Sequence, residues 1–166
     1  MVARRALATT RRIGSAAIVA VALVACGGDD SSQSTSGAVV VTDGVEVVDA
    51  WVRPSPPAVE SAAFYVTLRL AEGAAATALL EATSDRCAVV VPHASTVADD
   101  GVVTMDAALD EQLRLTTEHD IVMGPTGLHL MCLGLVEPLT TGEIVDVELR
   151  LAEHDAVVVP VSVERR

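Results

Sequence analysis

The pattern of apolar and polar residues from Val45 onward is that of an all-β protein. Segments such as "YVTLRL" and "IVDVELRL" alternate apolar and polar residues with a period of two, as half-buried strands do. Turn signals rich in Gly, Pro, Asp and Thr separate these segments. No segment shows a convincing helical stripe, although "EGAAATALLEA" has the alanine content of a short helical turn.

Short strands at this spacing are typical of an antiparallel β-sandwich of the cupredoxin-like or immunoglobulin-like type. The segment 45–166 is long enough to bury a core of that kind. The pattern predicts strands at 45–52, 62–70, 77–81, 87–91, 102–105, 112–115, 128–133, 143–151 and 156–163.

Residues 1–25 have the pattern of an export signal. The first twelve residues carry four arginines and no acid, and "IGSAAIVAVALV" follows at 13–24. This apolar run is shorter than the roughly 20 residues of a transmembrane helix but suits a secretory signal. It ends in "LVAC", which resembles a bacterial lipobox and implies that Cys26 is lipidated. The protein would then be a lipoprotein anchored to the outer face of the cell membrane, whereas the alternative is an ordinary signal peptide with an incidental cysteine.

Residues 26–44 begin with a Gly-, Ser- and Asp-rich stretch that has no apolar period. That composition predicts a flexible tether between the lipid and the folded domain 45–166.

The composition restricts the class of partner that the chain can bind and the residue types that can form its core. The formal charge is −12, and removing residues 1–25 with their four arginines makes it −16. A domain this acidic is a poor binder of nucleic acid. Because the chain has one Trp, one Tyr and one Phe, the core must consist of aliphatic residues, with Trp51 as its main aromatic or as a plug at its edge.

The segment "GLHLMCLGL" at 127–135 carries unusual chemistry for a short strand. Residues i and i+2 of a strand face the same side, so His129 and Met131 project together. The leucines beside them and Cys132 face the other way. If that second face is the core, His129 and Met131 lie on the outer face or at an edge.

Two residues of the same kind lie upstream, His93 after the apolar run "CAVVVP" and Met105 in "GVVTMDA". Two imidazoles and two thioethers form a soft, uncharged donor set, which favours Cu(I). Zinc sites normally use Cys, His and carboxylate, and Ca(II) and Mg(II) require oxygen ligands. If these four side chains converge, Cu(I) is the expected ion.

The segment "VEVVDAWVRPSPPAVESAAFYVTL" resembles the opening of the periplasmic copper-A chaperone family, PCu(A)C. Members begin with a strand ending in Ala-Trp-x-Arg, then a Pro-rich turn and a strand with an aromatic-Tyr pair. The segment "GLHLMCLGLVEPLTTGEIVDVELRL" resembles the second signature, a His-x-Met strand followed by Gly-Leu, Pro-Leu and Gly-Asp/Glu. The resemblance covers residues 45–163.

The resemblance implies a copper site made of His93, Met105, His129 and Met131. Residue 94 is Ala, so a methionine that often follows the first histidine is absent, and the interval from Met105 to His129 is longer than usual. The family fold is a cupredoxin-like sandwich. Its members deliver copper outside the cytoplasm, typically to the binuclear CuA centre of a cytochrome oxidase subunit, by ligand exchange and not as enzymes.

Cys87 and Cys132 remain after lipidation of Cys26, and an even count in an exported chain suggests one disulfide. Two unpaired buried thiols, or Cys132 as an additional copper ligand, are the alternatives. Met123 is expected as a hydrophobic turn residue, and His119 and His154 as exposed side chains.

Another function remains open, a lipid-tethered immunoglobulin-like binding module in which the His and Met residues are incidental. An enzyme has little support, because the sequence contains neither Gly-x-Ser-x-Gly nor His-Glu-x-x-His.

Overall fold

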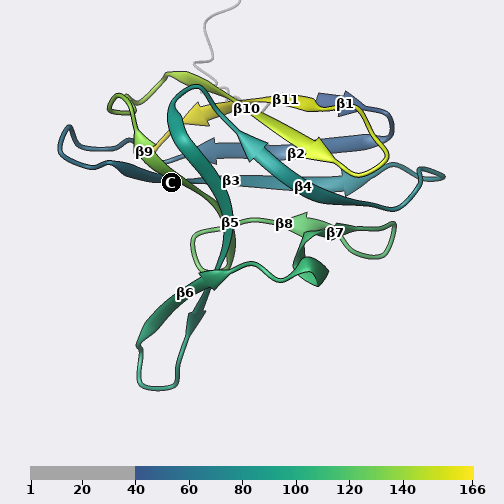
Figure 1. Cartoon of the computed structure of the whole chain (residues 1–166), viewed down its shortest axis with the longest axis horizontal. Helices are drawn as coiled ribbons and strands as arrows, with labels where there is room; N and C mark the ends of the chain where they lie inside the picture. The colour runs from purple at the N-terminus through teal and green to yellow at the C-terminus, as the bar shows by residue number, and fades with distance from the viewer. Residues whose placement is uncertain (1–39) are drawn as a thin grey trace, which may run out of the picture. The chain divides into compact units, whose positions relative to one another are not determined.

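The structure, a computed structural model, describes residues 40–166 and consists almost wholly of strands (Figure 1). No helix among these residues has the length and hydropathy to cross a membrane. The strands are β1 (Val40–Thr42), β2 (Val45–Val52), β3 (Ser61–Leu70), β4 (Thr77–Thr83), β5 (Cys87–Val97), β6 (Val103–Ala107), β7 (Arg114–Leu115), β8 (Ile121–Val122), β9 (Leu128–Leu135), β10 (Ile144–Leu151) and β11 (Val157–Val163), with a 3-10 turn η1 (Asp110–Leu113) before β7.

The main strands form a sheet that closes on itself. Hydrogen-bonded neighbours follow the order β2, β11, β10, β4, β5, β9 and β3, and β3 pairs back with β2. The pairs are antiparallel except β11 with β2, which run parallel where Ser162 lies opposite Trp51. The predicted fold class, an all-β sandwich, is therefore confirmed, with this one parallel pair as an exception.

The core is filled by alternate residues of these strands. In β10 the burial alternates regularly between exposed and buried positions, and in β11 the four valines at 157, 159, 161 and 163 point inward. Burying aliphatic side chains in this way stabilises the sheet by about 25 cal/mol per Å² of apolar surface. Phe64 is the aromatic side chain of this core.

Trp51 is buried at 7% exposure but does not belong to the core cluster, so it is not the main core aromatic and fits the alternative, a plug at the edge of the core. The pairing of β2 with β3 shifts by one residue between Val47 and Asp49. Such a bulge reverses which face the following residues occupy. Trp51 therefore packs outside the core against Tyr65, with ring centroids 4.4 Å apart, and the Arg166 guanidinium covers it at 4.9 Å.

Most predicted strands are confirmed, with shifts at their ends. Two short strands were not predicted: β1, which places the start of the sheet before Val45, and β8. Of the predicted strand 112–115, only the second half is a strand, β7, because the first half belongs to the turn η1. The Ala-rich segment forms no α-helix, because its second half pairs with β10 as β4.

The largest departure concerns β5, which continues past the predicted end at 91 to Val97. Its first part pairs with β9 in the closed sheet, and its last part pairs with β6. The resulting β5–β6 hairpin projects beyond the other strands (Figure 1). Its turn contains Gly101 at φ +83°, and the Asp100 carboxylate accepts a hydrogen bond from the Val102 amide at 3.0 Å.

An ion pair fixes the start of β5. Arg86, in the turn before β5, donates a hydrogen bond to Glu143 at the start of β10 and a second to the carbonyl of Pro138. The hydrogen bond from Arg86, together with one from the Thr140 amide, lowers the pKa of Glu143. The β4–β5 turn is thus tied to the loop between β9 and β10.

We expect Gly134→Ala to destabilise the fold more than an ordinary glycine substitution. Gly134 has φ +65°, and a Cβ there would lie 2.7 Å from the Cβ of Ala88 on β5. Positive φ and the clash together are expected to cost about 3 kcal/mol of unfolding free energy, measured by urea denaturation.

Gly73→Ala is the matched control, because Gly73 has φ +83° with nothing within 4 Å of the added Cβ. It is expected to cost about 1 kcal/mol. Equal losses for the two variants would show that β9 does not approach β5 as closely as the structure has it.

Candidate metal site

The pairing of β5 with β9 places two histidines side by side. His93 and His129 are direct partners across these antiparallel strands. Their ring centroids are 6.2 Å apart, and the ring planes are nearly perpendicular, at 83°. The two side chains are 129 − 93 = 36 positions apart in the sequence and are neighbours because of strand register.

The same register puts both methionines on the face that carries these histidines. Met131 lies opposite Val91, and Met105 on β6 lies opposite Ser95. Paired residues of antiparallel strands point to one face, and residues 91, 93 and 95 of β5 alternate onto that face. All four predicted ligands therefore share one face of the three strands β6, β5 and β9.

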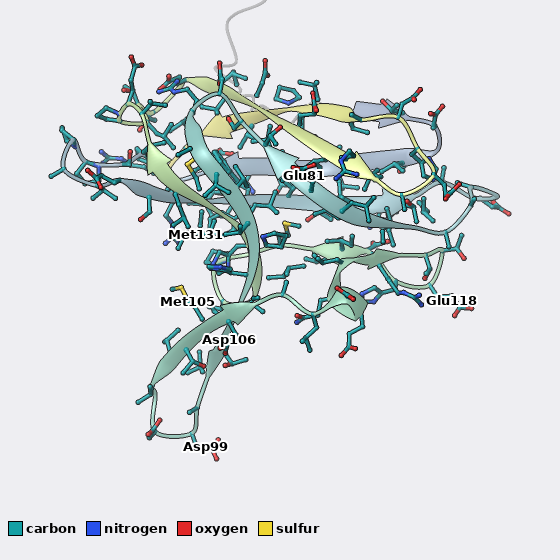
Figure 2. All side chains as sticks on the ribbon, viewed as in Figure 1. Glu81, Asp99, Met105, Asp106, Glu118 and Met131 are labelled. Atoms are coloured by element: carbon teal, nitrogen blue, oxygen red, sulfur yellow. A yellow bond between two sulfur atoms is a disulfide. The ribbon has the colours of Figure 1, made fainter. Side chains whose placement is uncertain are left out.

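Within this face the four residues lie along a diagonal. The histidines are in the middle, on β5 and β9, and the methionines are at the two ends. Figure 2 shows Met131 where β5 and β9 run together and Met105 nearer the projecting hairpin. The structure thus brings the two imidazoles together directly, whereas the two methionines lie on opposite sides of them along the diagonal.

Burial differs among the four residues. The His129 side chain is 3% exposed, His93 and Met131 are half-buried, and Met105 is 56% exposed. The expectation that His129 lies on an outer face is wrong, because both faces of β9 are covered where the strand begins. The site therefore has one buried imidazole, at His129, and is most open at Met105.

A hydrogen bond fixes the orientation of His129. Its Nδ1 lies 2.9 Å from the carbonyl oxygen of Gly127, in the turn before β9. Because a carbonyl only accepts, Nδ1 carries the hydrogen, and the lone pair is on Nε2. This backbone contact is the arrangement that typically holds a metal-binding histidine in one tautomer.

His93 has the opposite property, since its Nδ1 is buried and has no hydrogen-bond partner. A buried polar atom without a partner is rare in folded proteins and calls for an explanation. A metal ion bound between the two rings would provide one. The donor set therefore fits a soft, monovalent ion such as Cu(I).

The cysteines are excluded from this donor set. A disulfide joins Cys87 on β5 to Cys132 on β9, which is the first of the three arrangements that the cysteine count allows. Cys132 is fully buried and is next to Met131 on the opposite face of the strand. The disulfide connects the two strands that carry three of the four candidate ligands.

The remaining candidates lie away from the site or have other roles. Met123, expected as a hydrophobic turn residue, directly follows β8 and packs into the core at 4% exposure. His119 is exposed as expected, whereas His154 is half-buried. Within residues 40–166 no group of three or more His, Cys, Asp or Glu side chains could hold a metal ion. Cys26, the signal at 1–25 and most of the tether lie outside the described residues.

Sequence reasoning missed the role of Gly127. The turn "GPTG" directly precedes the His-x-Met strand, so the carbonyl that orients His129 comes from the residue two positions before it. The turn residues were the available signal, but only the backbone geometry shows where the carbonyl points.

Solved structures with the same fold include PCuAC domains, one of which is bound to copper. The apo PCuAC domain from PmoF1 matches with a TM-score of 0.62 and 16% identity, over 78% of this chain and 100% of that one. The copper-bound PCuAC domain from PmoF2 matches with a TM-score of 0.58 and 14% identity, over 78% and 99%. Apo-DR1885 from Deinococcus radiodurans matches with a TM-score of 0.56 and 19% identity, over 90% and 97%.

These neighbours define the class of protein: the chain has the fold of a PCuAC domain, as its motifs predict. The chain belongs to the LpqE-like family, whose model, described as "Putative lipoprotein LpqE-like", matches residues 45–163. A chain from Leifsonia xyli subsp. xyli (strain CTCB07), named "Putative lipoprotein Lxx21020", is 31% identical over 122 residues, which is 74% of this chain and 70% of that one.

We expect removal of the disulfide to destabilise the domain. Cys87→Ser with Cys132→Ser should lower the free energy of unfolding by about 4 kcal/mol, because the bond closes a loop with a sequence separation of 45. Urea denaturation of the two-site variant measures the loss. The parent protein treated with a reductant should show a similar loss, and equal stability before and after reduction would contradict the pairing.

Proposed function

We propose that this chain is a copper carrier that acts outside the cytoplasm. It binds one Cu(I) through His93, Met105, His129 and Met131 and releases it to a copper-requiring enzyme, such as the CuA site of a cytochrome oxidase subunit. Copper is the cargo in this role, and the protein itself catalyses no reaction.

The observation that carries the proposal is the shared face of the four donors. Register alone would scatter unrelated His and Met residues over both faces of the sheet, yet all four lie on one face of β6, β5 and β9. The adjacent imidazole rings and the unpartnered Nδ1 of His93 support the same conclusion. The PmoF2 domain, which has this fold, has been solved with copper bound.

The exposure gradient suggests how copper leaves. Met105 is the most exposed donor, so its bond to Cu(I) is the first that an acceptor can replace. In each exchange one Cu–S or Cu–N bond breaks as a bond to an acceptor ligand forms, and the copper stays monovalent. The two histidines, of which His129 is buried, hold the ion until the acceptor has supplied enough donors of its own.

A site of soft, uncharged donors also suits an oxidising compartment outside the cytoplasm. Thioethers do not pair into disulfides where thiols do, so they remain ligands in an oxidising environment. The cysteines of the folded domain are joined to each other and do not compete for the ion. The chain therefore separates its structural sulfur from its copper-binding sulfur.

We also propose that Cys26 carries a lipid that holds the protein on the outer face of the cell membrane. The support is the "LVAC" sequence at 23–26 and the family description as a lipoprotein. An anchored carrier and a membrane-bound oxidase would share one surface, which raises the effective concentration of each for the other.

The copper assignment is tested by titration of Cu(I) against a chromophoric chelator under reducing conditions. We expect one equivalent to bind. Met105→Leu with Met131→Leu should weaken binding at least about 100-fold, because both thioethers are lost while side-chain volume is kept. His129→Ala with Met131→Ala should abolish the high-affinity site.

Met123→Leu is the matched control, since Met123 is a core residue outside the site, and it should leave Cu(I) affinity unchanged. Binding that survives both double substitutions would contradict the carrier and would favour a tethered binding module without a metal role.

Lipid anchoring has a separate test in cells. Cys26→Ser should remove the lipid. In a detergent phase-partitioning assay the protein should then move from the detergent-rich phase to the aqueous phase. Incorporation of a labelled fatty acid should be lost at the same time. Unchanged partitioning of the Cys26→Ser protein would show that the cysteine is incidental.

A further inference from the structure

The β5–β6 hairpin has an apolar face that no part of residues 40–166 covers. Val97 and Val103 lie opposite each other near its end and are 59% and 55% exposed. Met105, 56% exposed, is next to them on β6. By strand alternation these three side chains share one face, which is the face that carries His93 and His129.

The other face of the hairpin is polar. Thr96 lies opposite Thr104, and their hydroxyl groups share a hydrogen bond at 2.7 Å. Asp106 follows on the same face by alternation. The hairpin is thus amphipathic, although it projects away from the closed sheet instead of packing on it (Figure 1).

Single exposed apolar residues are common and need no explanation. Here, however, three of them are contiguous on one face and lead directly to the proposed copper site. A clustered apolar surface of this kind is typical of interaction sites. Any protein that covers this face also contacts Met105, the donor most accessible for exchange.

The negative charge of the residues around this face restricts the kind of partner that can cover it. Asp99 and Asp100 lie at the tip of the hairpin, and Figure 2 shows Asp99 at its far end and Asp106 near Met105. No basic residue occurs between Arg86 and Arg114. A second copy of this chain would bring acidic hairpins together, and residues 27–39 of the chain carry two aspartates and no basic residue.

We propose that the apolar face of the β5–β6 hairpin, formed by Val97, Val103 and Met105, is the docking surface for the copper acceptor. The acceptor presents an apolar patch flanked by basic side chains, which meet Asp99 and Asp100 at the tip of the hairpin. This inference rests on the proposed copper-carrier function and names the surface through which that function operates.

The docking surface explains why the hairpin continues past the candidate donors. Val97 and Val103 lie beyond Met105 along the strands and have no donor atom for a metal ion. Opposite charges at the rim would steer the two proteins together and speed their encounter at low salt. The apolar centre would exclude water from Met105 during ligand exchange.

The test compares Cu(I) transfer to a protein with Cu(I) transfer to a small chelator. The probe protein is the soluble apo CuA domain of a cytochrome oxidase subunit. Val97→Thr with Val103→Thr keeps the β-branched shape but removes the apolar contact. We expect transfer to the CuA domain to slow at least about 10-fold. Cu(I) affinity and transfer to the chelator should not change, because no ligand is altered.

The matched control is Ile144→Thr with Val158→Thr, which changes two equally exposed apolar residues on β10 and β11 (56% and 52%). This variant should transfer copper at the rate of the parent protein. If both variants transfer at the parent rate, the hairpin is not the docking surface. If both slow transfer equally, the effect is not specific to the hairpin, and the proposal is likewise overturned.

Asp99→Asn with Asp100→Asn tests the charge. It should slow transfer at low ionic strength and flatten the dependence of the rate on salt. An unchanged salt dependence would contradict a basic rim on the acceptor. Asn at position 100 retains the side-chain oxygen that accepts from the Val102 amide, so the turn is kept.

The remaining outcomes separate this inference from the proposed function. If the parent protein fails to bind Cu(I), the copper function fails before docking is tested. If it binds Cu(I) but does not transfer it to the CuA domain, the docking partner named here is wrong. A dimer in solution that Val97→Thr with Val103→Thr dissociates would make a second copy the occupant and would overturn the proposal.

Discussion

The antiparallel register between β5 and β9 is the constraint on which the site depends. It sets His93 opposite His129, and the continuation of β5 into the hairpin sets Met105 on the same face. A slip of one residue would send a strand's donors to the other face, because side chains alternate along a strand. The Cys87–Cys132 bond and the close contact of Gly134 with Ala88 both join these two strands. The strongest structural restraints therefore lie beside the candidate donors.

In the proposed carrier, different residues would serve the binding of copper and its release. The sheet buries His129, and the Gly127 carbonyl fixes its tautomer. The thioether of Met105 lies on a projecting hairpin that the core does not cover. A buried, oriented imidazole and an accessible thioether suit the proposed carrier, since it must retain its ion in transit and yield it to another protein. In the proposed function, the amphipathic hairpin would in addition bind the protein that receives the ion.

The sequence predicted the fold class and most strands, because alternation and motif order are local properties. It also singled out the four candidate donors that strand register brings onto one face. It left open whether Trp51 lies in the core or at its edge, since the pattern does not reveal the bulged residue at Val48 that reverses the parity of the strand. Nor did it predict the burial of His129 or the length of β5, because both depend on what packs beyond the strand. The disulfide was one of several arrangements of two cysteines until the fold brought Cys87 and Cys132 together.

The most direct test of the central claim is X-ray absorption spectroscopy of the protein loaded with one equivalent of Cu(I). The account predicts a mixed first shell, with nitrogen from His93 and His129 and sulfur from Met105 and Met131. The sulfur contribution should disappear when both methionines are replaced by leucine. A copper shell of nitrogen and oxygen alone in the parent protein would contradict the account, because it would show that the thioethers on this face do not reach the ion.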